Sequence, residues 1–147
     1  MPQMLGDKFR VRLEKVQAEL QRVSEAKASE HYRDGGWTRK QVLGHLLDSA
    51  ANNHIRFVVA ALNGEFTGPK YDSEGWVRMH DYANLSWSYL YEQWRTQNTI
   101  IAQVVDHIPE EALEAPCRIG DDKPVTLRFI VEDYLDHMEE HLKDIVS

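Results

Sequence analysis

The chain has 147 residues, of which 42% are hydrophobic and 28% are charged, as is typical of one globular domain. Its 24 acidic residues outnumber 17 basic ones, and the formal charge of −7 argues against broad electrostatic binding of nucleic acid or anionic membranes. The single cysteine, Cys117, excludes an intrachain disulfide framework and a multi-cysteine zinc site. A metal in this protein would therefore be held by histidines and carboxylates.

A first helix is predicted near the N-terminus, because apolar residues recur there at steps of three and four. These residues are Leu5, Phe9, Leu13, Val16, Leu20 and Val23. The segment Met1–Arg10 lacks the pattern of a secretion signal, and no apolar run is long enough to span a bilayer. We therefore expect one cytoplasmic domain over residues 1–147.

A second helix is predicted from Thr38 to about Leu62. Thr38 and Gln41 have the spacing of a capping box, and Gly64 provides the stop. The interval that follows, to about His80, is predicted to be an irregular loop. Its aromatic side chains (Phe66, Tyr71 and Trp76) are expected to pack it against the body of the protein.

A third helix is predicted from about Asp81 to Asp106, and a short helical turn over residues 109–113. Residues 115–125 have the composition of a turn or small hairpin, and Thr126 is a candidate cap for a last helix that reaches Ile145. Four long helices with short to moderate connections predict an all-α fold, a four-helix bundle.

The second helix carries a line of polar side chains on an otherwise apolar surface. His45, Ser49, Asn52 and Arg56 follow one another at steps of four, three and four, which places them on one helix face. Such a line can be the wall of a polar pocket, or it can simply be the solvent side of the helix.

The last helix carries His137 and His141, whose i, i+4 spacing lets two imidazoles bind one metal ion. The residue after His137 is Met138, so this is not the H-E-x-x-H motif, and zinc peptidase chemistry is disfavoured. His45 would complete a three-histidine site if the second and last helices are neighbours. Alternatively, His45 is a hydrogen-bonded core histidine and the other two are exposed.

These residues together resemble the DinB/YfiT-like family of metal-dependent enzymes, which includes bacillithiol S-transferases. The resemblance rests on Trp37-Thr38, His45-Leu46-Leu47-Asp48-Ser49, Asn52, Ile55-Arg56-Phe57, and His137-x-x-x-His141 with Ile145. It implies a four-helix bundle, usually a homodimer, with one divalent metal, zinc or nickel, held by residues that map onto His45, His137 and His141.

The leading functional hypothesis is an enzyme that transfers a low-molecular-weight thiol to an electrophilic small molecule, with the metal holding the sulfur as thiolate. In this hypothesis Asn52 and Arg56 hold a carboxylate or amide of the thiol co-substrate. Asp48 or Asp133 orients a ligand imidazole. Asp48, Asn52 and Arg56 are therefore the candidate catalytic residues.

Two alternatives use the same site. A metal-dependent hydrolase would activate water there, with His54 or a nearby carboxylate taking the proton. A stress-related binding module would hold a small molecule or metal without turnover. Cys117 and the histidines near predicted helix ends (His31, His80 and His107) are left outside the site.

Overall fold

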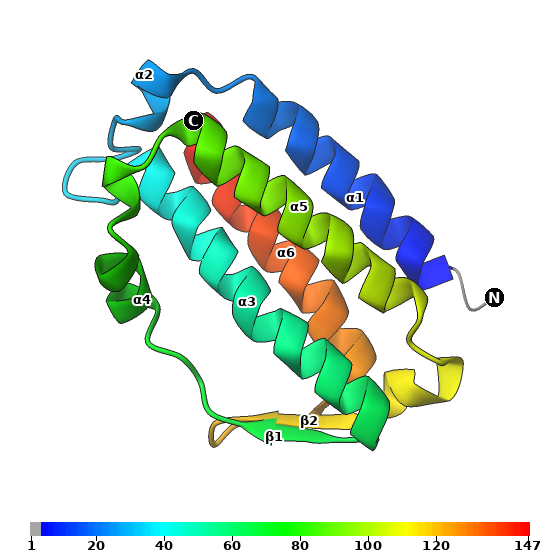
Figure 1. The fold of residues 1–147 in the computed structure, drawn as a ribbon. Coiled ribbons are helices and arrows are strands. Elements are labelled where there is room, and N and C mark those ends of the chain that lie inside the picture. The colour runs from blue at the N-terminus through cyan, green and yellow to red at the C-terminus, as the bar shows by residue number, and fades with distance from the viewer. Residues whose placement is uncertain (1–3) are drawn as a thin grey trace.

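The structure is a computed structural model that describes residues 4–147, so the first three residues of the predicted domain lie outside it. Four long helices form the body of the molecule (Figure 1). They are α1 (Met4–Gln21), α3 (Arg39–Asn63), α5 (Trp87–Asp106) and α6 (Leu127–Val146).

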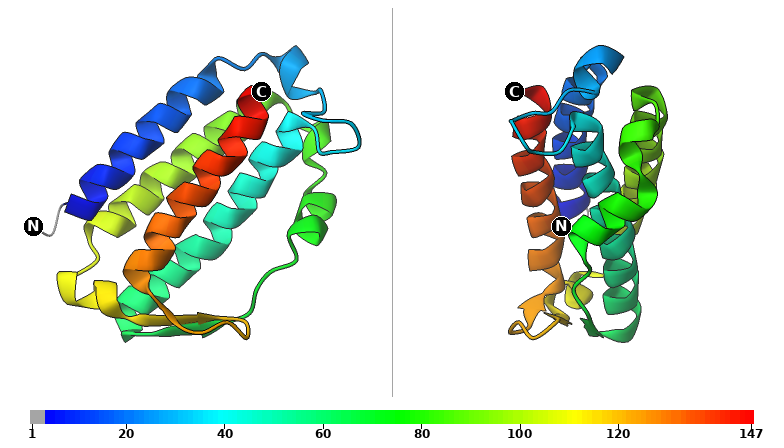
Figure 2. Two further views of the ribbon diagram at one scale, coloured as in Figure 1. Left: turned by 180° about the vertical axis from the view of Figure 1, so that it is seen from behind. Right: turned by 90° about the vertical axis from the view of Figure 1, so that its left-hand side faces the viewer.

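The order of these helices around the bundle decides where the site forms. Both α3 and α1 pack against α5 and α6, so α1 lies diagonally opposite α3. Figures 1 and 2 show that α1 and α6 run in one direction and that α3 and α5 run in the other. The first turns of α3 therefore lie beside the last turns of α6.

The core is formed by the apolar faces of the four helices. All six residues of the predicted N-terminal stripe are buried, as are Trp87 and Trp94 of α5. Tyr134 of α6 stacks on Phe9 with ring centroids 6.1 Å apart and meets Phe57 edge-on at 5.8 Å. The two tryptophans of α5 are thus used in packing.

The predicted helix ends are confirmed at three positions. Thr38 and Gln41 form the capping box at the start of α3, and Gly64 ends that helix in the left-handed conformation, with φ of 75°. The side chain of Thr126 accepts a hydrogen bond from the Phe129 amide at the start of α6. Each cap satisfies a backbone group that the helix leaves unpaired.

The strictly all-α prediction is wrong, because a small sheet closes one end of the bundle (Figure 2). Strand β1 (Phe66–Gly68) pairs in parallel with β2 (Pro116–Ile119), with Thr67 opposite Arg118. Strand β2 pairs in antiparallel fashion with β3 (Val125–Thr126), which confirms the predicted hairpin. The parallel pair joins distant segments of the chain, so no local pattern indicates it.

The segment before α5 also differs from the prediction. It contains a helix, α4 (Ser73–His80), and a 3-10 turn, η1 (Tyr82–Asn84), rather than only an irregular loop. Helix α5 begins after the cap residue Ser86 rather than at Asp81, which adopts a left-handed conformation with φ of 49°.

Two further short helices complete the chain: α2 (Glu25–Ala28) follows α1, and the 3-10 helix η2 (Glu110–Glu114) confirms the predicted turn before β2. Over residues 4–147, no helix combines the length and the apolar character that crossing a membrane requires.

Candidate metal centre

Three histidines from two neighbouring helices converge on one point. His45 lies in the second turn of α3, and His137 and His141 lie in the second half of α6. The Nε2 atom of His137 is 3.3 Å from that of His45 and 3.1 Å from that of His141. The ligand atoms of all three lie within 4.8 Å of one another. The adjacency of α3 and α6 thus brings together the residues that the sequence predicted as ligands.

The spacing of these nitrogens fits a metal ion. Nitrogen ligands about 2.0–2.1 Å from a tetrahedral zinc ion lie roughly 3.3–3.4 Å apart, close to the two Nε2 separations observed. Burial is the main cause that lowers the pKa of His45 to about 4, and the other two histidines lower it further. Burial also lowers the pKa of His137 and of His141. Neutral imidazoles with free lone pairs are the form that binds zinc or nickel.

The surroundings of His45 are mostly apolar. The Trp37 ring lies 5.3 Å from the His45 ring, and His45 is only 6% exposed. Its Nδ1 atom is buried and has no hydrogen-bond partner within residues 4–147. The expected orienting contact from Asp48 is not seen, because that carboxylate accepts a hydrogen bond from the Tyr82 hydroxyl instead.

A cavity of about 300 Å³ opens beside His137, between α3, α6 and the small sheet. Polar side chains from α3 line one part of it, and Ile119, Val125 and Ile130 add apolar lining. Asp133, one turn before His137, also faces this cavity, and its charge opposes the lowering of the His137 pKa by burial. The cavity, named the histidine cavity below, can hold a small molecule next to a bound metal.

Only some residues of the predicted polar line on α3 contribute to the wall of the histidine cavity. Ser49 and Arg56 line the histidine cavity, but Asn52 does not, and its amide donates to the Asp48 carbonyl at 2.9 Å. The next residue, Asn53, takes the place expected for Asn52 and donates to the Ser49 carbonyl at 2.8 Å. Asn52 and Asn53 lie three and four residues after Ser49, so spacing alone does not choose between them.

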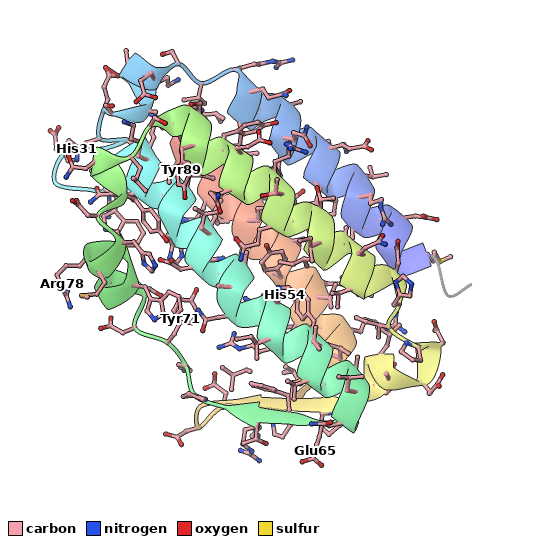
Figure 3. All side chains as sticks on the ribbon, in the orientation of Figure 1. His31, His54, Glu65, Tyr71, Arg78 and Tyr89 are labelled. Atoms are coloured by element: carbon pink, nitrogen blue, oxygen red, sulfur yellow. The ribbon has the colours of Figure 1, made fainter. Side chains whose placement is uncertain are left out.

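Arg56 is the more buried of the two basic residues, Arg56 and Lys123, that line the histidine cavity. It is half-buried, and burial is the main cause that lowers its pKa. Its Nη2 atom donates to the Pro69 carbonyl at 3.3 Å, and the guanidinium lies 5.9 Å from the ring centroid of Tyr71, which is labelled in Figure 3. Within residues 4–147 it makes no ion pair, so it can receive an anionic group from a ligand.

For two other residues, the position in the structure differs from the position predicted from the sequence. His54 does not line the histidine cavity, and Figure 3 shows it on the front side of α3, whereas α6 lies behind. It is therefore not positioned to take a proton from metal-bound water. Cys117, which the sequence analysis left outside the site, is buried and lines the histidine cavity, and burial raises the pKa of its thiol.

Sequence similarity to curated proteins covers part of the chain. The protein of Bacillus subtilis named "Putative metal-dependent hydrolase YfiT" is 37% identical over 79 residues, 51% of this chain and 44% of that protein. A similarly named protein of Oceanobacillus iheyensis is 41% identical over 51 residues, 35% of this chain and 30% of that protein. These sequence matches span less than half of either relative.

Solved structures share the fold over nearly the whole chain. The Bacillus subtilis YfiT structure, a four-helix bundle of unusual topology, matches with a TM-score of 0.83 and 26% identity, over 95% of this chain and 83% of that one. A mycothiol-dependent maleylpyruvate isomerase matches with a TM-score of 0.80 and 14% identity, over 99% of this chain and 60% of that one. A model of the DinB superfamily matches residues 8–145, and the chain belongs to this family.

Proposed function

We propose that the protein is a metal-dependent enzyme that joins a low-molecular-weight thiol to an electrophilic small molecule. The observation that carries this proposal is the set of three neutral imidazoles at the spacing of metal ligands, next to a cavity large enough for a small molecule. A divalent ion bound there, zinc or nickel, would hold the thiol as a thiolate at neutral pH.

Different residues of the histidine cavity would bind the thiol and the electrophile. Arg56, which makes no ion pair within residues 4–147, would bind a carboxylate of the thiol co-substrate. Asn53 and Ser49 would offer hydrogen bonds along the same wall. The apolar wall of Ile119 and Ile130 would accept the carbon skeleton of the electrophile.

Hydrolysis is the second candidate, and two observations favour it. The relatives with the sequence matches are named metal-dependent hydrolases. In addition, Asp133 lines the histidine cavity beside His137, where a carboxylate could take a proton from activated water. The mycothiol dependence of the structurally similar isomerase supports the thiol reaction instead.

One assay separates these reactions. The zinc- or nickel-loaded protein is incubated with a fluorogenic bimane electrophile and a panel of thiols, including mycothiol, and in parallel with small esters and amides without thiol. We expect conjugate to form faster than in the protein-free mixture only when metal-loaded protein and thiol are both present, and only at the uncatalysed rate with His141→Ala. Turnover of an ester without thiol would establish the hydrolase. Product that stops at one equivalent would indicate a binding module.

We also propose that the protein works in the cytoplasm as a homodimer on a small-molecule substrate, without nucleic acid or membrane partners. The net charge of −7 supports the exclusion of polyanions. The dimer is supported by an apolar groove between α1 and α6, where Met4 and Val11 are each more than half exposed.

A further inference from the structure

A second cavity, of about 270 Å³, lies between α3, α4 and α5. It shares no lining residue with the histidine cavity. Its walls bring together Asp48 from α3, Trp76 and His80 from α4, and Tyr89 from the first turn of α5, which Figure 3 labels. We call it the Asp48 cavity.

Asp48 is a buried carboxylate that lacks a full set of partners. It is 2% exposed, and its Oδ1 atom accepts a hydrogen bond from the Tyr82 hydroxyl at 2.5 Å. Its Oδ2 atom is buried and has no partner within residues 4–147. His80 does not fill this role, because its Nδ1 atom is 3.7 Å from Oδ1 and only 2.8 Å from the Trp76 carbonyl oxygen.

A buried carboxylate normally has a cation or several donors next to it, because removing the charge from water costs several kcal/mol. Among the described residues, no lysine or arginine lines the Asp48 cavity. Burial accordingly is the main cause that raises the pKa of Asp48. The missing partner is thus a positively charged group or a hydrogen-bond donor.

The other walls of the Asp48 cavity suit a cation. Trp76 and Tyr89 add aromatic rings, whose faces attract cations, while the Tyr82 ring is stacked on His80 with centroids 5.0 Å apart. Gln93 and Gln97 of α5 add amide oxygens that can accept hydrogen bonds. A single carboxylate is a poor site for a bare divalent ion, which prefers several oxygen ligands and more negative charge.

We propose that the Asp48 cavity binds a small molecule that carries a primary ammonium group, with Asp48 as the counter-ion. A primary ammonium has three N–H donors, one of which would pair with the Asp48 carboxylate, and its remaining positive charge would lie among the aromatic side chains of the lining. Because Oδ2 has no exposed surface, this pairing needs a side-chain shift that opens Oδ2 to the cavity. A quaternary ammonium has no such donor. The site is independent of the reaction proposed at the histidines.

The test is a titration of the zinc-loaded full chain with n-propylammonium chloride at pH 7, followed through the tryptophan indole N–H signals in NMR. The chain has four tryptophans, and Trp76→Phe assigns the signal of the Asp48 cavity. We expect a saturable shift of the Trp76 signal and none of the Trp37 signal, which reports on the histidine site.

Variants and analogues locate the binding. Asp48→Asn should weaken propylammonium binding at least tenfold, because it removes the charge but keeps the shape. Asp133→Asn, which removes a carboxylate of the histidine cavity, should leave it unchanged. In the wild type, 1-propanol and tetramethylammonium should bind at least tenfold more weakly than propylammonium.

Three results would overturn the proposal: no saturable shift of the Trp76 signal, equal binding by Asp48→Asn, or equal binding of 1-propanol. Should circular dichroism show that Asp48→Asn does not fold, the comparison of propylammonium with 1-propanol in the wild type decides. None of these readouts depends on turnover, so a failure of the proposed thiol reaction would leave the result intact.

Discussion

Arg56 is the residue whose charge most directly concerns substrate choice. It is half-buried in the histidine cavity without an ion pair within residues 4–147, so a ligand carboxylate would gain a charge-assisted interaction at little further desolvation cost. Arg56→Ala should raise KM for a carboxylate-bearing thiol about tenfold or more, since such hydrogen bonds contribute about 1.5–3 kcal/mol. Metal content should stay unchanged.

Steady-state kinetics with and without the carboxylate on the thiol would check this role. Arg56→Lys is the conservative control, because it keeps the charge and loses the planar donor geometry. The KM of Arg56→Lys for the carboxylate-bearing thiol should lie between those of the wild type and Arg56→Ala. Equal KM values in wild type and Arg56→Ala for every thiol would remove Arg56 from the binding site.

His45 should make the metal-free protein sensitive to acid. Its pKa is about 4 in the folded state, against about 6.5 when unfolded. The unfolded chain therefore binds more protons between these values, and the free energy of unfolding falls as the pH drops from about 6.5 towards 4. Urea unfolding at pH 7 and pH 5 would measure this loss, which His45→Gln should reduce. The same loss in both proteins would contradict the burial argument.

The sequence allowed us to predict a site residue where its spacing along one helix is sufficient. It did not where the choice depends on which side of the helix faces the site. His137 and His141 belong together at i, i+4, whatever the bundle looks like. Choosing between Asn52 and Asn53 requires knowing on which side of α3 the neighbouring helix α6 lies. The role of Asp48 was predicted wrongly for a related reason. Its hydrogen-bond partner Tyr82 belongs to the segment before α5, whose structure differs from the prediction.

At the level of elements, the start of α3 positions His45 two turns after a capping box. Thr38→Ala removes the side-chain acceptor for the Gln41 amide and should lower the free energy of unfolding by about 1 kcal/mol. Chemical denaturation checks the value. Ser24→Ala, at the cap of the short helix α2, is a control that should cost less, because that helix has four residues. A larger cost for Ser24→Ala would be inconsistent with this account.

The elements with strong local signals were predictable, namely the four long helices, their caps and the β2–β3 hairpin. Strand β1 and the segment just before α5 were not. Strand β1 has only three residues and is defined by its pairing with β2, some fifty positions away. The apolar periodicity of Tyr82 and Leu85 suggested an early start of α5. Instead, Tyr82 belongs to a 3-10 turn, Leu85 is extended, and Ser86 provides the actual cap.

At the scale of the whole molecule, the apolar groove between α1 and α6 predicts self-association. Val11 and Met4 are exposed there above the buried Leu5 and Leu135, and charged residues (Asp7, Lys8, Arg12 and Glu132) line the rest of the groove. Light scattering after size exclusion should give twice the 17.1 kDa of one chain. Val11→Glu should give the monomer, while Ile55→Glu, an equally exposed apolar position on α3, should not. A monomeric wild type would rule out the dimer.

The bundle order, with α3 and α6 adjacent and antiparallel, is what makes a three-histidine metal centre possible, and metal content tests it most directly. Elemental mass spectrometry of the tag-free protein should find about one zinc or nickel ion per chain. His45→Ala and His137→Ala should lose the metal, while His54→Ala, a histidine of α3 outside the histidine cavity, should retain it. A wild type that binds neither ion after incubation, or an equal loss in His54→Ala, would contradict the metal centre.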